Sequence, residues 1–186
     1  MTHLMRTLRL AALTVLTIST ISAAPGRQAS AQAIAHSASA AWYEDHWIDL
    51  SESWEGAGAC NIGPSGSVCY HSETEMDQDL ASTLGAASTT EQLAPASSCS
   101  SSLRLYDGTS YAGSVLNLYT RFTSINLSTY GFDNLTSSYR VGACAASFYS
   151  GASGSGTLYP GNTGANASSA SMAAGWNNVV SSIYIS

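Results

Sequence analysis

The sequence contains no lysine, and its six basic residues are all arginine. Three of these arginines precede residue 28, which leaves three for the rest of the chain against twelve aspartates and glutamates. Binding to nucleic acid or to an anionic membrane surface depends on a basic patch or stripe, which three scattered arginines do not provide. The composition therefore disfavours both kinds of partner and predicts an acidic protein, with a formal net charge of −6 at pH 7.

Long apolar runs are scarce as well. The longest follows Arg9, reads LAALTVLTISTISAA, and is too short and too rich in Thr and Ser to span a bilayer comfortably. Small residues at Ala31–Ala33, with Ala23 as an earlier candidate, are typical of a signal peptidase site. We therefore expect residues 1–33 to be a secretory signal peptide, with a retained membrane anchor as the alternative. After its removal the protein is expected to be extracellular and free of the membrane.

Cysteine is limited to four residues. An even number in an exported protein indicates disulfides, here with three possible pairings. We favour Cys60–Cys69, which closes a short loop, and Cys99–Cys144, which ties the start of the second half to its middle. A zinc site is the alternative, although the cysteines lack a close pair and no histidine follows His71.

The acidic residues are concentrated in one part of the chain, between Glu44 and Glu91, and only Asp107 and Asp133 follow. Residues 34–98 are therefore expected to form an acidic, tryptophan-rich appendage with a disulfide loop. The segment WYEDHWIDLSESWEG carries three Trp residues, which we expect to pack onto a neighbouring surface.

A short helix is predicted within this appendage. Ser72 is a typical N-cap, Glu75 completes a capping box, and Met76, Leu80 and Leu84 follow at helical spacing, with Gly85 as the expected end. The acidic side chains of the helix are expected to form a solvated face rather than a catalytic carboxylate pair. They are Glu73, Glu75, Asp77 and Asp79.

From residue 99 onward Gly, Ser, Thr, Asn and Tyr dominate the sequence. Apolar and polar residues alternate between turn residues, which predicts short strands and an all-β antiparallel sandwich. The phrase GFDNLTSSYRV, from Gly131, returns as GWNNVVSSIYI from Gly175. Residues 103–141 and 145–185 are therefore predicted to be two similar units that bury a core by stacking on one another.

Each unit begins with a hairpin pattern, Tyr106-x4-Tyr111-x-Gly113 in the first, followed by DNLTSS or NNVVSS. This combination resembles the βγ-crystallin Greek-key motif of secreted microbial calcium-binding crystallins. The resemblance covers residues 103–186, and Gly154 is the departure, since the family has an aromatic residue there. It implies a βγ-crystallin-like sandwich of two Greek-key motifs over residues 99–186.

The resemblance also implies two Ca²⁺ sites shared between the two loops. Calcium accepts six to eight oxygens, including carbonyl, amide and hydroxyl oxygens. The implied ligands of one site are the Asp107 and Leu135 carbonyls, the Ser137 hydroxyl and the Asn178 side chain. Those of the other are the Ser150 and Val179 carbonyls, the Ser181 hydroxyl and the Asn134 side chain. Asp133 and Asn177 are expected to brace the loops. Without a firm carboxylate ligand, both sites should be weak, on the order of 10⁻⁵–10⁻³ M.

The sequence thus predicts a secreted, calcium-binding, structural or protective module, monomeric and without catalytic activity. A Ser/His/Asp hydrolase is not expected, because the β half lacks histidine. Two other classes stay open. One is a protease inhibitor or antifungal toxin-like protein on the same fold, with residues 60–69 as its rigid loop. The other is a module that binds carbohydrate or cell-wall polysaccharide, suggested by the Tyr and Trp content.

Overall fold

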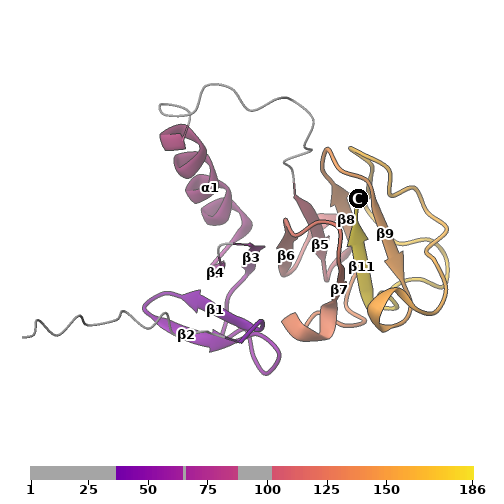
Figure 1. The fold of residues 1–186 in the computed structure, drawn as a ribbon, viewed down its shortest axis with the longest axis horizontal. Coiled ribbons are helices and arrows are strands. Elements are labelled where there is room, and N and C mark those ends of the chain that lie inside the picture. Colours follow the sequence, from indigo (N-terminus) through magenta and orange to yellow (C-terminus); the bar gives the residue numbers. More distant parts are fainter. Residues whose placement is uncertain (1–36, 65, 88–101) are drawn as a thin grey trace, which may run out of the picture. The chain divides into compact units, whose positions relative to one another are not determined.

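The computed structural model describes residues 37–64, 66–87 and 102–186, which belong to one compact unit. The expected signal peptide, residues 88–98 and Cys99 lie outside the described residues. Across the described ranges, no helix combines the length and the apolar character that a membrane span requires. The fold is mostly β, with one α-helix and three short 3-10 helices in the described part (Figure 1).

The elements are named in chain order. The strands are β1 (Ala40–Tyr43), β2 (His46–Asp49), β3 (Ala59–Gly63), β4 (Gly66–Tyr70), β5 (Leu103–Tyr106), β6 (Val115–Leu118), β7 (Ser124–Asn126), β8 (Ser138–Val141), β9 (Ala146–Tyr149), β10 (Ser168–Ser169) and β11 (Ser182–Ile185). The helix α1 spans Glu73–Ala87, and the 3-10 helices are η1 (Thr109–Tyr111), η2 (Leu127–Tyr130) and η3 (Ala152–Gly154).

The predicted pair of Greek keys is confirmed by the strand order. In the first unit β5, β6 and β8 are neighbours in one sheet, while β7 crosses over to pair with β11 of the second unit. In the second unit β9 and β11 are paired, while β10 crosses back to pair with β8. Each unit thus completes the other's sheet, which explains why the repeat is folded as a pair.

The core lies between the two sheets and is built from the alternation seen in the sequence. On β5, Leu103 and Leu105 are buried against it, whereas Arg104 points to the opposite face. The ring of Tyr139, from β8, meets the ring of Phe148, from β9, edge-on at 5.0 Å between centroids. Aromatic contacts of this kind join the two units directly.

The N-terminal segment, residues 37–64 and 66–87, continues the larger sheet. Strand β3 runs parallel to β6 in the register Cys60↔Leu116, and β4, β1 and β2 follow outward from it. Within the described residues this sheet has eight strands, in the order β10-β8-β5-β6-β3-β4-β1-β2. The segment that the sequence indicated as an appendage therefore shares a sheet with the first Greek key. Strand β6, whose four residues are all buried, lies between β5 and β3 in this sheet.

The disulfide predicted between Cys60 and Cys69 is confirmed. The two residues face each other across β3 and β4, with 4.0 Å between their Cα atoms. Cys144 is also disulfide-bonded, and its expected partner, Cys99, is outside the described residues. The Cys60–Cys69 disulfide joins residues 9 positions apart. A cross-link that closes so short a loop adds about 2–3 kcal/mol to the free energy of unfolding in the chain-entropy account.

Helix α1 begins where the sequence predicts. The Glu75 N–H donates to the Ser72 hydroxyl at 3.2 Å, and the Glu75 carboxylate accepts the His71 N–H at 3.0 Å. The expected end at Gly85 is wrong, since the helix runs on to Ala87. A glycine inside a helix costs about 1 kcal/mol relative to alanine, and the alanines that follow are strong helix formers.

The predicted solvated face of α1 is also wrong in part, because three of its acidic residues bind the sheet. One of them, Asp79, accepts the Tyr70 hydroxyl of β4 at 2.7 Å. Arg104 of β5 forms ion pairs with both Glu73 and Asp77. The Tyr106 hydroxyl donates to the same Glu73 carboxylate at 2.7 Å. Burial raises the pKa of Tyr106, and the bond to Glu73 raises it further. Carboxylates that would repel one another on an isolated helix are thus held by one guanidinium.

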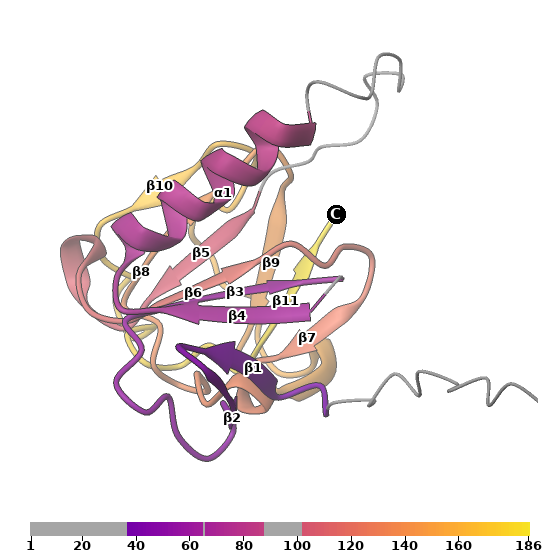
Figure 2. The same ribbon diagram turned by 90° about the vertical axis from the view of Figure 1, so that its left-hand side faces the viewer.

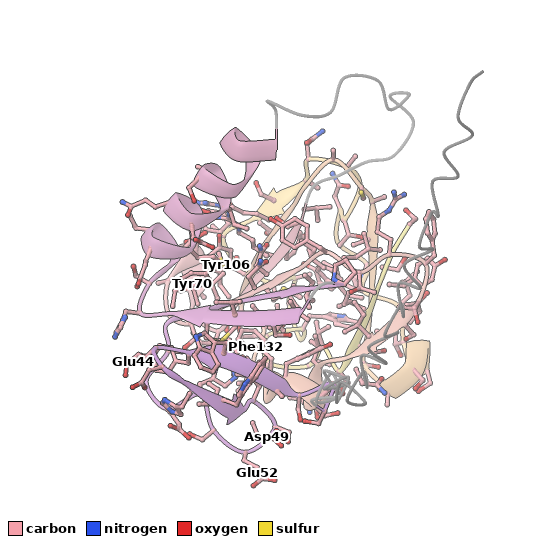
Figure 3. The ribbon with its side chains drawn as sticks, turned by 60° about the vertical axis from the view of Figure 1, so that its left-hand side comes forward. Glu44, Asp49, Glu52, Tyr70, Tyr106 and Phe132 are labelled. Atoms are coloured by element: carbon pink, nitrogen blue, oxygen red, sulfur yellow. A yellow bond between two sulfur atoms is a disulfide. The ribbon has the colours of Figure 1, made fainter. Side chains whose placement is uncertain are left out.

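Helix α1 lies over one face of the larger sheet, opposite the three-stranded sheet (Figures 1 and 2). Beneath it, the fully buried Met76 packs in a small cluster with Tyr70 and Tyr106, the two residues labelled under the helix in Figure 3. The cluster joins α1, the N-terminal segment and the first Greek key, so these three parts are expected to unfold together.

Candidate metal centre

Two loops approach one another between the Greek keys: the first loop, residues 131–138, and the second loop, residues 175–182. Asn134 and Asn178 occupy equivalent places and both adopt left-handed backbone conformations, with φ of 56° and 58°. Asparagine tolerates this region better than most residues. The Asn134 N–H donates to the Val180 carbonyl at 3.0 Å, and the Asn178 N–H donates to the Thr136 carbonyl at 3.1 Å. Each loop therefore fixes the other.

The side chains cross between the loops in the same reciprocal way. The Ser137 hydroxyl lies 3.0 Å from Asn178 Oδ1, and the Ser181 hydroxyl lies 3.3 Å from Asn134 Oδ1. The Leu135 carbonyl is 3.4 Å from the Ser137 hydroxyl. Two groups of neutral oxygens are thus brought together, each with a serine from one loop and an asparagine from the other.

The hairpins bring further carbonyl groups beside these oxygens. The Ser137 N–H donates to the Tyr106 carbonyl at 2.8 Å, and the Ser181 N–H donates to the Tyr149 carbonyl at 2.9 Å. The next residues along the chain are Asp107 and Ser150. Their side chains are used within the hairpins, because Asp107 Oδ1 accepts the Ser114 N–H at 2.7 Å and Ser150 Oγ accepts the Thr157 N–H at 2.8 Å.

The second serine of each Ser-Ser pair closes the adjacent hairpin. The buried Ser138 hydroxyl donates to the Gly108 carbonyl at 2.6 Å, and the buried Ser182 hydroxyl donates to the Gly151 carbonyl, also at 2.6 Å. The two serines of each Ser-Ser pair therefore have different partners. One hydroxyl meets the oxygens of the opposite loop and the other fastens the hairpin of its own unit.

Gly154, the departure from the family pattern, preserves the hairpin backbone. Its φ of 75° is close to the 62° of Tyr111 at the equivalent position. In the first unit the Tyr111 ring packs on Tyr106 at 5.6 Å and under the Arg140 guanidinium at 4.1 Å. The second hairpin has no such ring, and the N–H of Gly154 donates to the Ser182 hydroxyl at 2.9 Å.

The structure thus pairs the side chains of four of the expected site residues, Asn134, Ser137, Asn178 and Ser181. The other six stand next to these pairs along the chain or in the hairpins; they are Asp107, Asp133, Leu135, Ser150, Asn177 and Val179. Asp133 accepts a hydrogen bond from the Asn134 amide at 3.1 Å, whereas Asn177 is exposed. Over the residues that the structure describes, no three of His, Cys, Asp and Glu gather as metal ligands.

Sequence reasoning missed a contact between the first loop and the N-terminal segment. Trp54 donates its indole N–H to the Tyr130 carbonyl at 2.8 Å, and its ring lies 5.6 Å from that of Phe132. The expectation that a Trp of this segment packs on a neighbouring surface holds for Trp54. The surface itself, at the start of the first loop, could not be identified because Trp54 and Tyr130 are 76 positions apart in the sequence.

The first loop also contains an unpaired buried hydroxyl, which yields a stability prediction. Thr136 is fully buried, and its Oγ1 has no hydrogen-bond partner in the described part of the chain. The equivalent residue in the second loop is the fully buried Val180. An unsatisfied buried hydroxyl costs about 1–3 kcal/mol, so Thr136→Val should raise the free energy of unfolding by about 1 kcal/mol in urea titrations.

The mirror substitution serves as its control. Val180→Thr places a hydroxyl in the equivalent apolar position and should lower the free energy of unfolding by about 1–3 kcal/mol. A loss of stability in Thr136→Val would mean that the hydroxyl has a partner in solution.

No protein-family model matches the chain, and no curated protein matches it. Solved structures do. A βγ-crystallin from Ciona intestinalis is 20% identical, with 46% of this chain and 99% of that one covered and a TM-score of 0.39. A βγ-crystallin domain from Flavobacterium johnsoniae is 25% identical, with 45% and 92% covered and a TM-score of 0.38. The N-terminal domain of protein S is 22% identical, with 46% and 96% covered and a TM-score of 0.39. The solved structures to which this chain is similar are βγ-crystallin domains.

Proposed function

We propose that the paired loops bind two calcium ions and that the protein is a secreted, non-catalytic module stabilised by them. The observation that carries the proposal is the reciprocal pairing of Ser137 with Asn178 and of Ser181 with Asn134. In each pair the serine hydroxyl donates to the amide oxygen of the other loop, which brings oxygens of two chain segments together. Hard cations such as Ca²⁺ accept hydroxyl, amide and carbonyl oxygens of this kind.

The proposed calcium sites should be weak, because their side-chain ligands, serine hydroxyls and asparagine amides, are neutral. Calcium affinity rises with the number of carboxylate ligands, and extracellular modules bind with dissociation constants on the order of 10⁻⁴–10⁻³ M. At a calcium concentration about 100 times the dissociation constant, each site adds ~2.7 kcal/mol to the free energy of unfolding. For a chain of this size, each kcal/mol added to the free energy of unfolding raises the Tm by about 2–4 °C.

The test is a calorimetric calcium titration of the secreted protein, with thermal melts in calcium and in chelator. The wild type should show two weak binding events and a higher Tm in calcium. Asn134→Gly/Asn178→Gly should lose both, because glycine removes the amide oxygens while keeping the left-handed backbone accessible. Asn166→Gly is the matched control, since Asn166 has a φ of 61° but lies outside both loops.

The control should bind calcium as the wild type does. A flat wild-type titration with identical melts in calcium and chelator would refute the proposal and leave the paired loops as turns only.

A carbohydrate- or wall-binding role is the second candidate, and it rests on a different surface. Trp42 and Trp47 are 38% and 45% exposed, and their rings meet edge-on at 5.4 Å on β1 and β2. Exposed aromatic rings can stack on sugars. Retention of the protein on chitin, glucan or peptidoglycan, and its loss in Trp42→Ala/Trp47→Ala, would support this role.

The protease-inhibitor alternative receives less support. The loop proposed for it is the turn between β3 and β4, and both strands lie inside the sheet, between β6 and β1. Both cysteines of the loop are buried. Only the short turn is left to enter a protease cleft.

A further inference from the structure

The two candidate calcium loops have different surroundings. At the start of the first loop, Gly131 has a φ of 63°, and a Cβ there would lie 2.3 Å from the Leu50 carbonyl oxygen and 3.5 Å from the Trp54 indole nitrogen. At the start of the second loop, Gly175 has a φ of 79°, and a Cβ there would meet nothing within 4 Å. The N-terminal segment thus contacts one loop of the pair closely at a point where the other is open.

The contact is made by a firm turn of the N-terminal segment. Leu50 is 1% exposed, and its N–H donates to the Ser39 carbonyl at 2.9 Å. The Asp49 carbonyl accepts two N–H groups, from Glu52 and Ser53, each at 3.0 Å. Figure 3 labels Asp49, the last residue of β2, and Glu52, which follows it on this turn. The turn therefore presents Trp54 to the first loop from a fixed direction.

Trp54 contacts two residues that lie just before the proposed ligands in the chain, Tyr130 and Phe132. Its indole N–H donates to the Tyr130 carbonyl at 2.8 Å, and its ring packs at 5.6 Å on Phe132, the buried anchor of the loop. The equivalent anchor of the second loop, Trp176, instead packs edge-on against Tyr159 at 5.2 Å, within its own unit. The added contact from the N-terminal segment is specific to the first loop.

We propose that Trp54 is a positioning residue for the first loop, so that docking of the N-terminal segment and calcium binding strengthen one another. The inference rests on the proposed function. The first loop supplies Ser137 to one site and Asn134 to the other, so its conformation affects both. A loop held in its binding conformation loses less freedom when the ion binds. By thermodynamic linkage, calcium must then tighten the docking of Trp54 by the same factor.

The experiment compares four variants of the secreted protein by calorimetric calcium titration. Trp54→Phe keeps an aromatic ring but loses the N–H donor, and Trp54→Ala loses both. Trp42→Phe and Trp42→Ala are the matched controls, because Trp42 is exposed on β1, on the other face of the sheet from the core. A net hydrogen bond corresponds to roughly a 2- to 10-fold change in affinity. We expect weakening in that range for Trp54→Phe, a larger one for Trp54→Ala, and less than twofold for both controls.

A second readout separates positioning from general stability. If Trp54 acts on the loop, the rise in Tm caused by calcium should be smaller in Trp54→Ala than in the wild type. The indole N–H signal of Trp54 should also shift and exchange more slowly on calcium addition, whereas that of Trp42 should not. An equal Tm loss in chelator and in calcium, with unchanged affinity, would show that Trp54 is merely structural and overturn the inference.

The calcium titration of the wild type separates the positioning role of Trp54 from calcium binding itself. If the wild type binds no calcium, the proposed function is overturned, and the inference with it. If the wild type binds two ions and the Trp54 variants match the Trp42 controls, calcium binding stands and the positioning role alone is overturned.

Discussion

Phe132→Ala should lower the free energy of unfolding by about 3–5 kcal/mol, the loss typical of a large buried aromatic side chain. Phe132 is 1% exposed and belongs to the main core cluster between the sheets. Its N–H also donates to the Leu127 carbonyl at 2.9 Å, which anchors the start of the first loop. Truncation leaves a cavity that the surrounding residues fill only in part. Urea unfolding at a fixed calcium concentration measures the difference.

Phe122→Ala is the matched control for this prediction. Phe122 is 67% exposed, and the Arg121 guanidinium lies over its ring, 4.4 Å from the centroid. An exposed cation–π contact contributes about 0.5–1 kcal/mol, so the loss should be no greater than that. Phe132→Leu should fall between the two alanine variants. Equal losses at positions 122 and 132 would contradict the anchoring role of Phe132.

Asn178→Asp should tighten the proposed calcium site that this residue would share with Ser137 by at least about tenfold. The substitution keeps the size of the side chain and its tolerance of a left-handed backbone, and it adds a carboxylate at the position of Asn178 Oδ1, 3.0 Å from the Ser137 hydroxyl. Charge among the ligands is the main determinant of calcium affinity in sites of this kind. A tenfold change corresponds to about 1.4 kcal/mol, which calorimetric titration resolves.

Asn134→Asp should tighten the other site but with an added effect on the calcium-free protein. The Asn134 amide donates to Asp133, and a carboxylate in its place would face Asp133 as a like charge. Stability in chelator should therefore fall in this variant and not in Asn178→Asp, whose neighbour is the neutral Asn177. Asn166→Asp adds the same charge in the same backbone region outside the loops. A similar gain in affinity there would mean that the gain comes from net charge alone.

The sequence could predict the parts of the fold that are repeated in it and those that depend on a few neighbouring residues. The repeated phrase from Gly131 and Gly175 predicts two units, and the paired loops confirm their equivalence down to the roles of Ser138 and Ser182. The start of α1 was equally predictable, because a cap depends on a few neighbouring residues such as Ser72 and Glu75.

The parts that could not be predicted depend on residues far apart in the chain. The parallel pairing of β3 with β6 brings together Asn61 and Asn117, which are 56 residues apart and share a hydrogen bond of 3.0 Å. Their polarity interrupts the apolar pattern that marks a central strand. The contact of Trp54 with Phe132 has no local signature either. The acidic residues of α1 likewise predict a solvated face, because nothing local in the sequence indicates that Arg104 lies beside Glu73 and Asp77.

The position of β3 decides which strand forms the outer edge of the larger sheet. Strand β6, with the sequence Val-Leu-Asn-Leu, is fully buried, and without β3 it would end the sheet as an open apolar edge. Such edges pair with other chains and lead to aggregation. The N-terminal segment moves this edge outward to β2, a strand of four residues on which His46 and Asp49 are exposed. A short edge with polar and charged side chains resists pairing, so we expect the segment to limit self-association of the Greek keys as well as to enlarge their sheet.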